Sequence, residues 1–336
     1  MNILIASHSA CHDRQMFFYR ELSKYLSNTV IIGPKRWGQL KLLNSTEQGF
    51  ITRGLVTSNE RNLEAFQFLG LDLTVQLSLN LFLGTHKKFD IFLVQEEWWS
   101  RATTDLFALA NRIGAKKVLF TWENIRTPNI KEIETIKQAD AIICGNDDAK
   151  QIIKGCDYPG FIFRFPQVGI NTELFCPLTE EKTYDLVFCG RPVPEKGFPI
   201  IEKIAKIQGW KLAVAYNQPY PNLPVLLNQA RISVSLPQDT PHWKEQSGGY
   251  SSLEALSCGI PIITTNCGAI PEYIPKEIGI ILPQGRDIEQ VFPKAVEKLL
   301  HSELAEIGLK GRIFITNNYS NQTIAKQTAE MLESLL

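Results

Sequence analysis

The most informative stretch of this 336-residue chain is Gln246-Ser-Gly-Gly-Tyr-Ser-Ser-Leu-Glu254-Ala-Leu-Ser-Cys-Gly-Ile-Pro-Ile-Ile-Thr-Thr265. Two adjacent glycines run into a short helical pattern, and Gly-x-Pro then leads into a buried strand. Glycines let the backbone approach a ligand closely, and a helix start offers N–H groups without helical partners and a positive dipole end. The stretch therefore predicts a phosphate site, with the Glu254 carboxylate within reach of a hydroxylated group such as a ribose.

A second loop with phosphate-binding character comes earlier in the chain and reads Gly190-Arg191-Pro-Val-Pro-Glu-Lys196-Gly197. It follows a buried strand and is stiffened by two prolines. Arginine can grip a phosphate with two parallel hydrogen bonds, and lysine acts as a point charge. The alternative is a solvated surface loop whose charges touch nothing. The two loops in this order are a more specific sign of a phosphate-binding site than either loop alone.

The composition is that of a globular α/β protein. Its hydrophobic fraction is 44% and its charged fraction 21%, and its length suits two domains. Because 35 basic residues balance 35 acidic ones, the charge gives no case for nucleic acid as a partner. The seven cysteines are scattered, several of them in apolar runs, which indicates reduced, buried thiols rather than a disulfide framework or a metal site.

The expected location is the cytoplasm. The first residues, Met-Asn-Ile-Leu-Ile-Ala, are too short and uncharged a run for a signal peptide, and no apolar run approaches the roughly 18 residues needed to cross a bilayer. The stretch from Gly33 to Lys41 mixes basic and aromatic residues. A plain surface loop is the expected interpretation, and a weak peripheral contact with the inner face of an anionic membrane is the alternative.

Short β-branched runs alternate with amphipathic helical stretches, as in parallel sheets built from strand–helix–strand units. Strands are predicted at 3–6, 30–32, 91–94, 118–121, 141–144 and 161–165, and then at 186–189, 212–215, 232–236, 261–264 and 279–282. Helices are predicted at 14–26, 59–69, 101–112, 131–138 and 147–153, and then at 198–206, 223–229, 250–258, 288–300, 303–316 and 321–335. The helical pattern stops between two prolines at 166 and 177, which places a domain boundary there.

Together these residues resemble the nucleotide-sugar-binding domain of the retaining, metal-independent glycosyltransferases of family four (glycosyltransferase group 1 type). That family shows Gly-Arg…Glu-Lys-Gly after a strand, and later an acid, seven residues, and then Glu-Ala-(Met/Leu)-(Ala/Ser)-Cys-Gly-x-Pro. The corresponding residues here are Gly190-Arg191…Glu195-Lys196-Gly197 and Gln246…Glu254-Ala-Leu-Ser-Cys-Gly259-Ile-Pro261. The likeness is strong over about residues 139–275 and thin before them.

The resemblance implies the GT-B architecture, with two Rossmann-like doubly wound domains that face each other across a cleft. We expect an acceptor-binding domain over 1–165, a linker over 166–183 and a nucleotide-sugar-binding domain over 184–320. A final helix over 321–336 is expected to return to the N-terminal domain. The implied reaction moves a sugar from a nucleoside diphosphate sugar to a glycan, lipid-linked or small-molecule acceptor, with retention of configuration and without a metal or other cofactor. A UDP-sugar or a GDP-sugar is the expected co-substrate.

The resemblance also implies roles for single residues. Arg191 and Lys196 would bind the donor diphosphate and stabilise charge on the leaving group, Glu254 would accept hydrogen bonds from the ribose, and Gln246 would contact the transferred sugar. The remaining donor contacts would come from the backbone at Gly190, Gly248, Gly249, Tyr250 and Ser251.

The chief departure from the family is Gln246, which stands where the family has its first acid. A glutamine amide can bond sugar hydroxyls but brings no negative charge to a cationic transition state. Glu245 is adjacent but one residue out of register with Gly249 and Glu254, so we expect its side chain to point elsewhere. The alternatives to a transferase are a nucleotide-sugar epimerase of the same fold and a catalytically silent nucleotide-sugar or glycan-binding protein.

The N-terminal half departs further from the family, and its candidate acceptor or sugar contacts rest on residue type alone. A polar loop after the first strand carries His12 and Arg14, for which a plain capping loop is the alternative. Two later strands end in acids beside tryptophans, a combination that suits carbohydrate but also fits an acidic rim with buried aromatics. The candidates there are Glu97, Trp122 and Glu123, and His242 is a further candidate in the second half.

Overall fold

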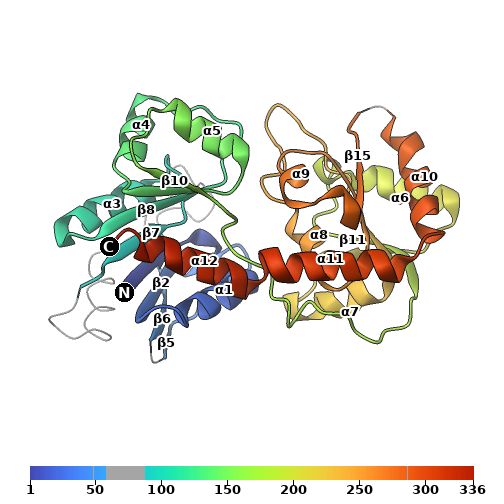
Figure 1. The fold of residues 1–336 in the computed structure, drawn as a ribbon, viewed down its shortest axis with the longest axis horizontal. Coiled ribbons are helices and arrows are strands. Elements are labelled where there is room, and N and C mark those ends of the chain that lie inside the picture. The colour runs from blue at the N-terminus through green and yellow to red at the C-terminus, as the bar shows by residue number, and fades with distance from the viewer. Residues whose placement is uncertain (48, 58–87, 286) are drawn as a thin grey trace. The chain divides into compact units, whose positions relative to one another are not determined.

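The computed structural model describes residues 1–47, 49–57, 88–285 and 287–336 (Figure 1). The chain divides into two compact units. Unit 1 consists of Met1–Gly169 together with Ile324–Leu336, and unit 2 consists of Ile170–Thr323. The helix predicted at 59–69 lies outside the described residues.

Unit 1 is built on an eight-stranded sheet in the order β10-β9-β8-β7-β1-β2-β6-β5. All neighbouring strands are parallel except β5 and β6, which form an antiparallel pair at one edge. The central strand β1 is covered on both faces, since Ile3 to Ala6 are fully buried, as expected of a doubly wound sheet. The strands are β1 (Asn2–Ala6), β2 (Asn28–Pro34), β5 (Ser45–Glu47), β6 (Phe50–Leu55), β7 (Ile91–Val94), β8 (Lys116–Thr121), β9 (Ala141–Cys144) and β10 (Phe161–Arg164).

Three of the helices of unit 1 begin at residues whose side chains cap them. Ser100 and Asn146 each accept a hydrogen bond from a first-turn N–H, and Asn129 forms a reciprocal capping box with Glu132. Gly114 ends one helix in the left-handed conformation, at a φ of 71°. The helices are η1 (His8–Cys11), α1 (Asp13–Ser23), α3 (Arg101–Ile113), α4 (Ile130–Lys137) and α5 (Asp147–Gly155), followed at the end of the chain by α12 (Asn321–Glu333), most of which belongs to unit 1.

Unit 2 is a five-stranded, wholly parallel sheet in the order β12-β11-β13-β14-β15. Buried Phe188, Ile232 and Val234 of the sheet pack with Phe292 and Val296 of a covering helix. The strands are β11 (Tyr184–Cys189), β12 (Leu212–Ala215), β13 (Ala230–Val234), β14 (Ile262–Thr265) and β15 (Gly279–Leu282). The helices are η3 (Pro194–Lys196), α6 (Phe198–Gln208), η4 (Tyr220–Asn222), α7 (Leu223–Asn228), α8 (Tyr250–Ser257), α9 (Ile270–Tyr273), η5 (Lys276–Ile278), α10 (Ile288–Leu300) and α11 (Leu304–Tyr319).

Both units confirm the predicted α/β class, and the differences from the predicted elements are local. The stretch expected as a plain surface loop forms a small antiparallel hairpin, β3 (Arg36–Trp37) with β4 (Leu40–Lys41), whose Trp37 ring lies 4.9 Å from the ring of His8. Strands β5 and β6 were not predicted, because their short, mixed sequences become strands only by pairing, β6 with β2 and β5 with β6.

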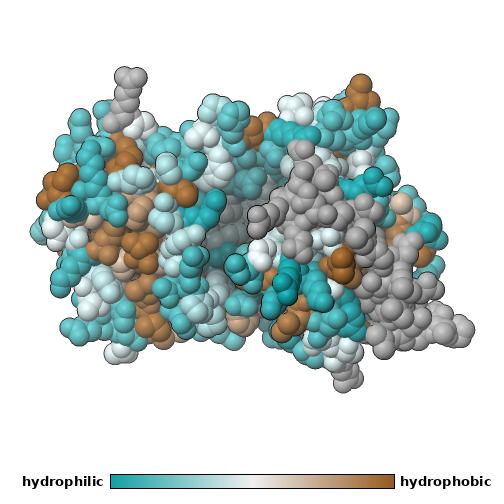
Figure 2. All heavy atoms as spheres, turned by 180° about the vertical axis from the view of Figure 1, so that it is seen from behind, coloured by the Kyte–Doolittle hydropathy of each residue, from teal (hydrophilic) through white to brown (hydrophobic). Residues whose placement is uncertain are grey.

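On the face that Figure 2 shows, the described side chains are mainly hydrophilic, and hydrophobic ones gather in smaller groups. All seven cysteines are free, and five of them are buried. Within the described ranges, no helix is long and apolar enough to span a bilayer.

Parallel strands place their following loops at one edge of the sheet. In unit 2, the loops after β11, β12, β13 and β14 therefore lie at the same edge, where ligands of doubly wound sheets usually bind. Both sequence motifs fall on these loops.

Candidate functional site

The loop after β11 is fastened to the segment that follows β13. The backbone N–H of Leu236 donates to the carbonyl oxygen of Lys196 (3.2 Å), and the N–H of Gln238 donates to that of Glu195 (3.1 Å). Gly190 and Gly197 both have positive φ, 145° and 70°. These bonds hold the Lys196 backbone at the carboxyl edge of the sheet. Arg191, at the start of the same loop, is exposed.

Lys196 contacts two residues of the loop between β13 and α8. Its ammonium pairs with the carboxylate of Glu245 and lies 4.9 Å from the centroid of the Trp243 ring. The side chains of Lys196 and Glu245 are only 24% and 12% exposed. The expectation that Glu245 would point away from the candidate site was therefore wrong, since its carboxylate pairs with the lysine that is expected to bind phosphate.

The direction of the Glu245 side chain is set by tertiary contacts, which the spacing of the motif residues does not reveal. The N–H of Ala269 donates to the carbonyl oxygen of Glu245 (2.9 Å), and the N–H of Glu245 lies 3.4 Å from the sulfur of Cys267. The segment after β14 thus fixes the backbone at residue 245. Gln246, one residue on, is exposed, as is His242.

The two glycines before α8 have different structural roles. A β-carbon on Gly248 would lie 2.5 Å from the β-carbon of Tyr273, so close packing alone requires a glycine there. Gly249 is the N-cap of α8, with a φ of 70° and no side-chain hydrogen bond to the helix. Tyr250 and Ser251 form the first turn of α8, where backbone N–H groups have no helical acceptors. The local geometry therefore suits an anion at this helix start.

Glu254 is fully buried on α8. Its Oε1 accepts a hydrogen bond of 2.7 Å from the hydroxyl of Tyr220, which is in η4 after β12. The Tyr220 ring lies against Phe175, at 5.1 Å between ring centroids. Tyr220 was not predicted from the sequence, because nothing in the motif indicates which residue of another loop reaches the Glu254 carboxylate.

In unit 1, the ends of β1 and β7 bring together two residues that are not among the candidates predicted from the sequence. Glu96 is buried, and it accepts a hydrogen bond from the backbone N–H of His8 while its Oε2 lies 2.9 Å from His8 Nδ1. The hydroxyl of Ser9 lies 3.1 Å from His8 Nε2. Burial lowers the pKa of His8, but the charge of Glu96, its hydrogen bond and the charge of Glu97 together raise that pKa above its ordinary value.

Glu97 is held at the end of β8. Its Oε2 accepts a hydrogen bond from the hydroxyl of Thr121 (2.5 Å), and its Oε1 accepts one from the backbone N–H of Trp122 (2.9 Å). Burial raises the pKa of Glu97 to about 7, the two hydrogen bonds lower it, and the charges of Glu123 and Glu96 add to the rise. Glu97 can therefore change its protonation state near neutral pH.

Two other candidates of unit 1, Glu123 and Trp122, make contacts within the fold. The Oε1 atom of Glu123 accepts hydrogen bonds from two backbone N–H groups of its own loop, at Ile125 and Arg126 (2.7 Å each). Trp122 packs over Gly145, where a β-carbon would lie 2.1 Å from the indole ring. His12 is the exposed N-cap of α1, and Arg14 lies in the first turn of the same helix.

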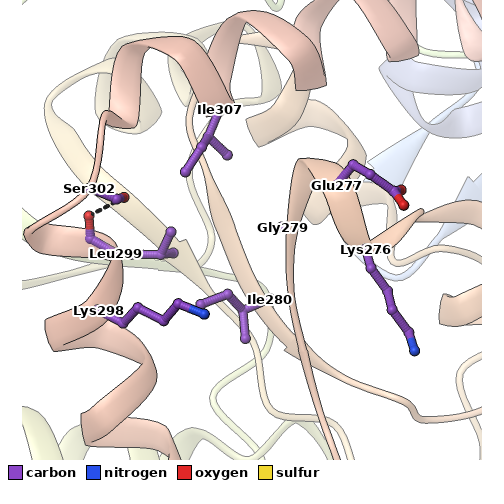
Figure 3. Close-up of a pocket in the computed structure, with 8 residues that line it drawn as sticks. All are labelled: Lys276, Glu277, Gly279, Ile280, Lys298, Leu299, Ser302 and Ile307. Carbon is purple, nitrogen blue, oxygen red and sulfur yellow. Dashed lines mark hydrogen bonds between the residues drawn. The ribbon is translucent and has the colours of Figure 1, made fainter.

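A pocket of unit 2 lies away from these residues (Figure 3). It surrounds Gly279 and Ile280 at the amino end of β15, and in Figure 3 the side chain of Lys298 extends toward Ile280. The loops with the sequence motifs are at the carboxyl ends of the strands. The pocket therefore contributes nothing to the candidate site; its remaining lining residues are Lys276, Glu277, Leu299, Ser302 and Ile307.

Comparison with known proteins agrees with this placement. Residues 178–320 match the family described as Glycosyl transferases group 1. Over 85 residues the chain is 29% identical to a GDP-mannose-dependent alpha-(1-6)-phosphatidylinositol monomannoside mannosyltransferase of Mycobacterium tuberculosis. That match covers 25% of this chain and 22% of the relative, so the chain is matched to about a fifth of the relative's length.

Several solved structures match almost the whole chain, and two of them illustrate the likeness. The sucrose-phosphate synthase of Thermosynechococcus elongatus superposes with a TM-score of 0.71 at 15% identity, covering 100% of this chain and 99% of that one. Anabaena HepE in complex with UDP and glucose superposes with a TM-score of 0.70 at 12% identity, covering 99% and 100%. At such identities the likeness establishes the fold. The chain therefore has the GT-B fold, and its residues 178–320 are similar to the glycosyl transferases group 1 family.

Proposed function

We propose that the chain is a glycosyltransferase that moves a sugar from a nucleoside diphosphate sugar to an acceptor hydroxyl. The observation that carries the proposal is the meeting of the two motif loops within unit 2, where Lys196 of the first contacts Trp243 and Glu245 of the second. The start of α8 and Glu254 follow directly on that second loop. A cation, a helix start and a carboxylate at one sheet edge suit the diphosphate and ribose of a nucleotide.

The donor is a UDP-sugar or a GDP-sugar. The HepE structure contains UDP, and the mycobacterial relative is named as dependent on GDP-mannose. Both names support a nucleoside diphosphate sugar, and they differ in the base. Arg191 and Lys196 bind the diphosphate, the backbone from Gly249 to Ser251 binds the same phosphates, and Gln246 contacts the sugar.

The reaction retains the configuration at the anomeric carbon and uses no metal. The bond from that carbon to the β-phosphate oxygen breaks, and the acceptor oxygen forms its new bond on the same face. The acceptor proton passes to the leaving phosphate. The transition state carries positive charge on the sugar ring and negative charge on the phosphate. Lys196, Arg191 and the N–H groups of α8 stabilise the negative charge.

Unit 1 supplies the acceptor site. Glu97, Trp122 and the pair of His8 and Glu96 are at the carboxyl edge of its sheet, and they combine aromatic surface with hydrogen-bonding groups as carbohydrate binding requires. The acceptor is a glycan or a lipid-linked sugar. The hairpin of β3 and β4, which carries Arg36 and Lys41, supports a weak contact with an anionic membrane surface.

One observation favours a second candidate, a protein that binds a nucleotide sugar without turning it over. Gln246 replaces an acid at the position expected to face the sugar, so no negative charge from that residue stabilises a cationic ring.

Incubation of the purified chain with UDP-, GDP- and ADP-sugars separates the candidates. Release of the nucleoside diphosphate, faster when acceptor glycans are added, supports the transferase. Conversion of the donor to an isomeric sugar nucleotide without release would indicate an epimerase of the same fold. Tight binding with neither product would indicate the silent protein. Arg191→Ala should abolish release, and Arg231→Ala, a charge-matched control at the start of β13, should not.

A further inference from the structure

Two charged groups of the proposed donor site are each bound to another side chain of unit 2. The ammonium of Lys196 is paired with the carboxylate of Glu245, and the carboxylate of Glu254 accepts a hydrogen bond from the hydroxyl of Tyr220. We propose that Glu245 and Tyr220 are donor-site residues that hold the places of a phosphate oxygen and a ribose hydroxyl, and that nucleotide binding displaces both. This inference rests on the proposed function.

Glu245 offers Lys196 the same kind of partner as a phosphate. In both cases an ammonium donates to an anionic oxygen. The backbone of Glu245 is fixed by its bonds to Ala269 and Cys267, so the carboxylate can leave Lys196 by rotation of its side chain alone. The Trp243 ring remains beside the ammonium and keeps it in place when the carboxylate leaves.

Tyr220 offers Glu254 the same kind of partner as a ribose. A phenol hydroxyl and a ribose hydroxyl both donate a hydrogen bond to a carboxylate. Because Glu254 is fully buried, a ribose can reach the oxygen now bonded to Tyr220 only if Tyr220 moves away. Tyr220 is on a three-residue helix, η4, preceded by the exposed residues 216–219. Asn217 in that run has a φ of 56°, a conformation that non-glycine residues rarely adopt.

The two internal contacts have a consequence for affinity. A nucleotide that must replace existing contacts binds with an apparent affinity reduced by the fraction of molecules in which the site is open. Removing an internal partner without touching Lys196 or Glu254 should therefore strengthen nucleotide binding. A role in holding Lys196 or Glu254 in place would have the opposite effect, because binding would then weaken.

The test is calorimetric titration of the full chain with UDP and with GDP, comparing Glu245→Gln, Tyr220→Phe and the double variant with the parent. Each single variant should bind about three- to tenfold more tightly, and the double variant more tightly still. Association rates measured by stopped flow should rise in the same order, because displacement precedes binding.

Matched substitutions elsewhere in unit 2 serve as controls. Glu202→Gln removes an exposed carboxylate on α6, and Tyr184→Phe removes a phenol hydroxyl at the opposite end of β11. Neither should change affinity by more than about twofold. Melting curves of all variants check folding, and Glu245→Gln alone suffices if Tyr220→Phe does not fold.

The outcomes separate this inference from the proposed function. Equal or weaker binding by folded Glu245→Gln, with nucleotide bound by the parent, overturns the inference and leaves the donor site standing. No binding of UDP or GDP by the parent or by any folded variant overturns the donor site, and the inference with it. Binding by the variants but not by the parent supports both.

Discussion

A β-carbon on Gly197 would lie 2.2 Å from the carbonyl oxygen of Leu236, so the loop after β11 and the segment after β13 meet backbone to backbone. The same two segments are joined by the hydrogen bond from Leu236 to the carbonyl of Lys196. Gly197 therefore determines how closely Lys196 approaches the neighbouring loop. Its role is steric as well as conformational.

Gly197→Ala should destabilise unit 2 strongly. A β-carbon there meets backbone atoms that cannot rotate away, and the φ of 70° adds a cost of about 1 kcal/mol for any L-residue. Gly209→Ala is the matched control, with a φ of 72° and no atom within 4 Å of the added carbon. Calorimetry should show a loss of about 1 kcal/mol for Gly209→Ala and at least about twice that for Gly197→Ala. Equal losses would mean that the segments can separate without cost.

Lys196→Ala should lower kcat/KM for the donor by about 30- to 1000-fold, which corresponds to about 2 to 4 kcal/mol of transition-state stabilisation. The reason is that its ammonium would stabilise the charge that develops on the leaving phosphate. Lys203→Ala serves as the control, because this exposed lysine on α6 pairs with Glu289 and belongs to neither motif loop. Steady-state kinetics with nucleotide release as the signal measures both variants. A comparable loss in the two would show that lysine removal acts through folding.

Glu97→Gln should change how the stability of unit 1 depends on pH. With a pKa raised from 4.5 to about 7, the folded chain binds more protons at this carboxyl than the unfolded chain between those values. The free energy of unfolding therefore falls as pH rises from about 4.5 to 7, by about 2 to 3 kcal/mol from this group. His8, whose pKa is also raised, contributes in the same direction. Melting temperatures from pH 4.5 to 8 should decline less in Glu97→Gln than in the parent.

Glu134→Gln, an exposed acid on α4, is the control for the Glu97 experiment and should keep the decline of the parent. An unchanged pH dependence in Glu97→Gln would show that Glu97 is ionised throughout this range.

Gln246→Glu should leave folding intact and give a turnover at least equal to that of the parent. Gln246 is exposed, so the change should alter stability by less than about 0.5 kcal/mol, and a carboxylate there could stabilise a cationic sugar. Donor turnover is compared with that of Glu254→Ala, which should lose ribose binding. If Gln246→Glu loses as much activity as Glu254→Ala, the glutamine amide itself has a specific role.

The sequence alone indicates the α/β class, because alternating strand and helix periodicities can be recognised without knowledge of distant contacts. It also located the two motif loops, since parallel strands place their following loops at one edge wherever the strands occur. It did not predict β6, which pairs with β2, or β5, which pairs with β6, nor the bending of residues 36–41 into a hairpin.

Which side chains meet depends on contacts between segments that are far apart in the sequence. The prediction for Glu245 failed because register along one segment says nothing of the bonds to Ala269 and Cys267 that fix its backbone. Tyr220 and His8 were missed for the same reason, since each meets its carboxylate across a gap in sequence of 34 and 88 residues. A motif indicates which residues belong to a site, whereas the direction of each side chain is set by the packing of segments far apart in the chain.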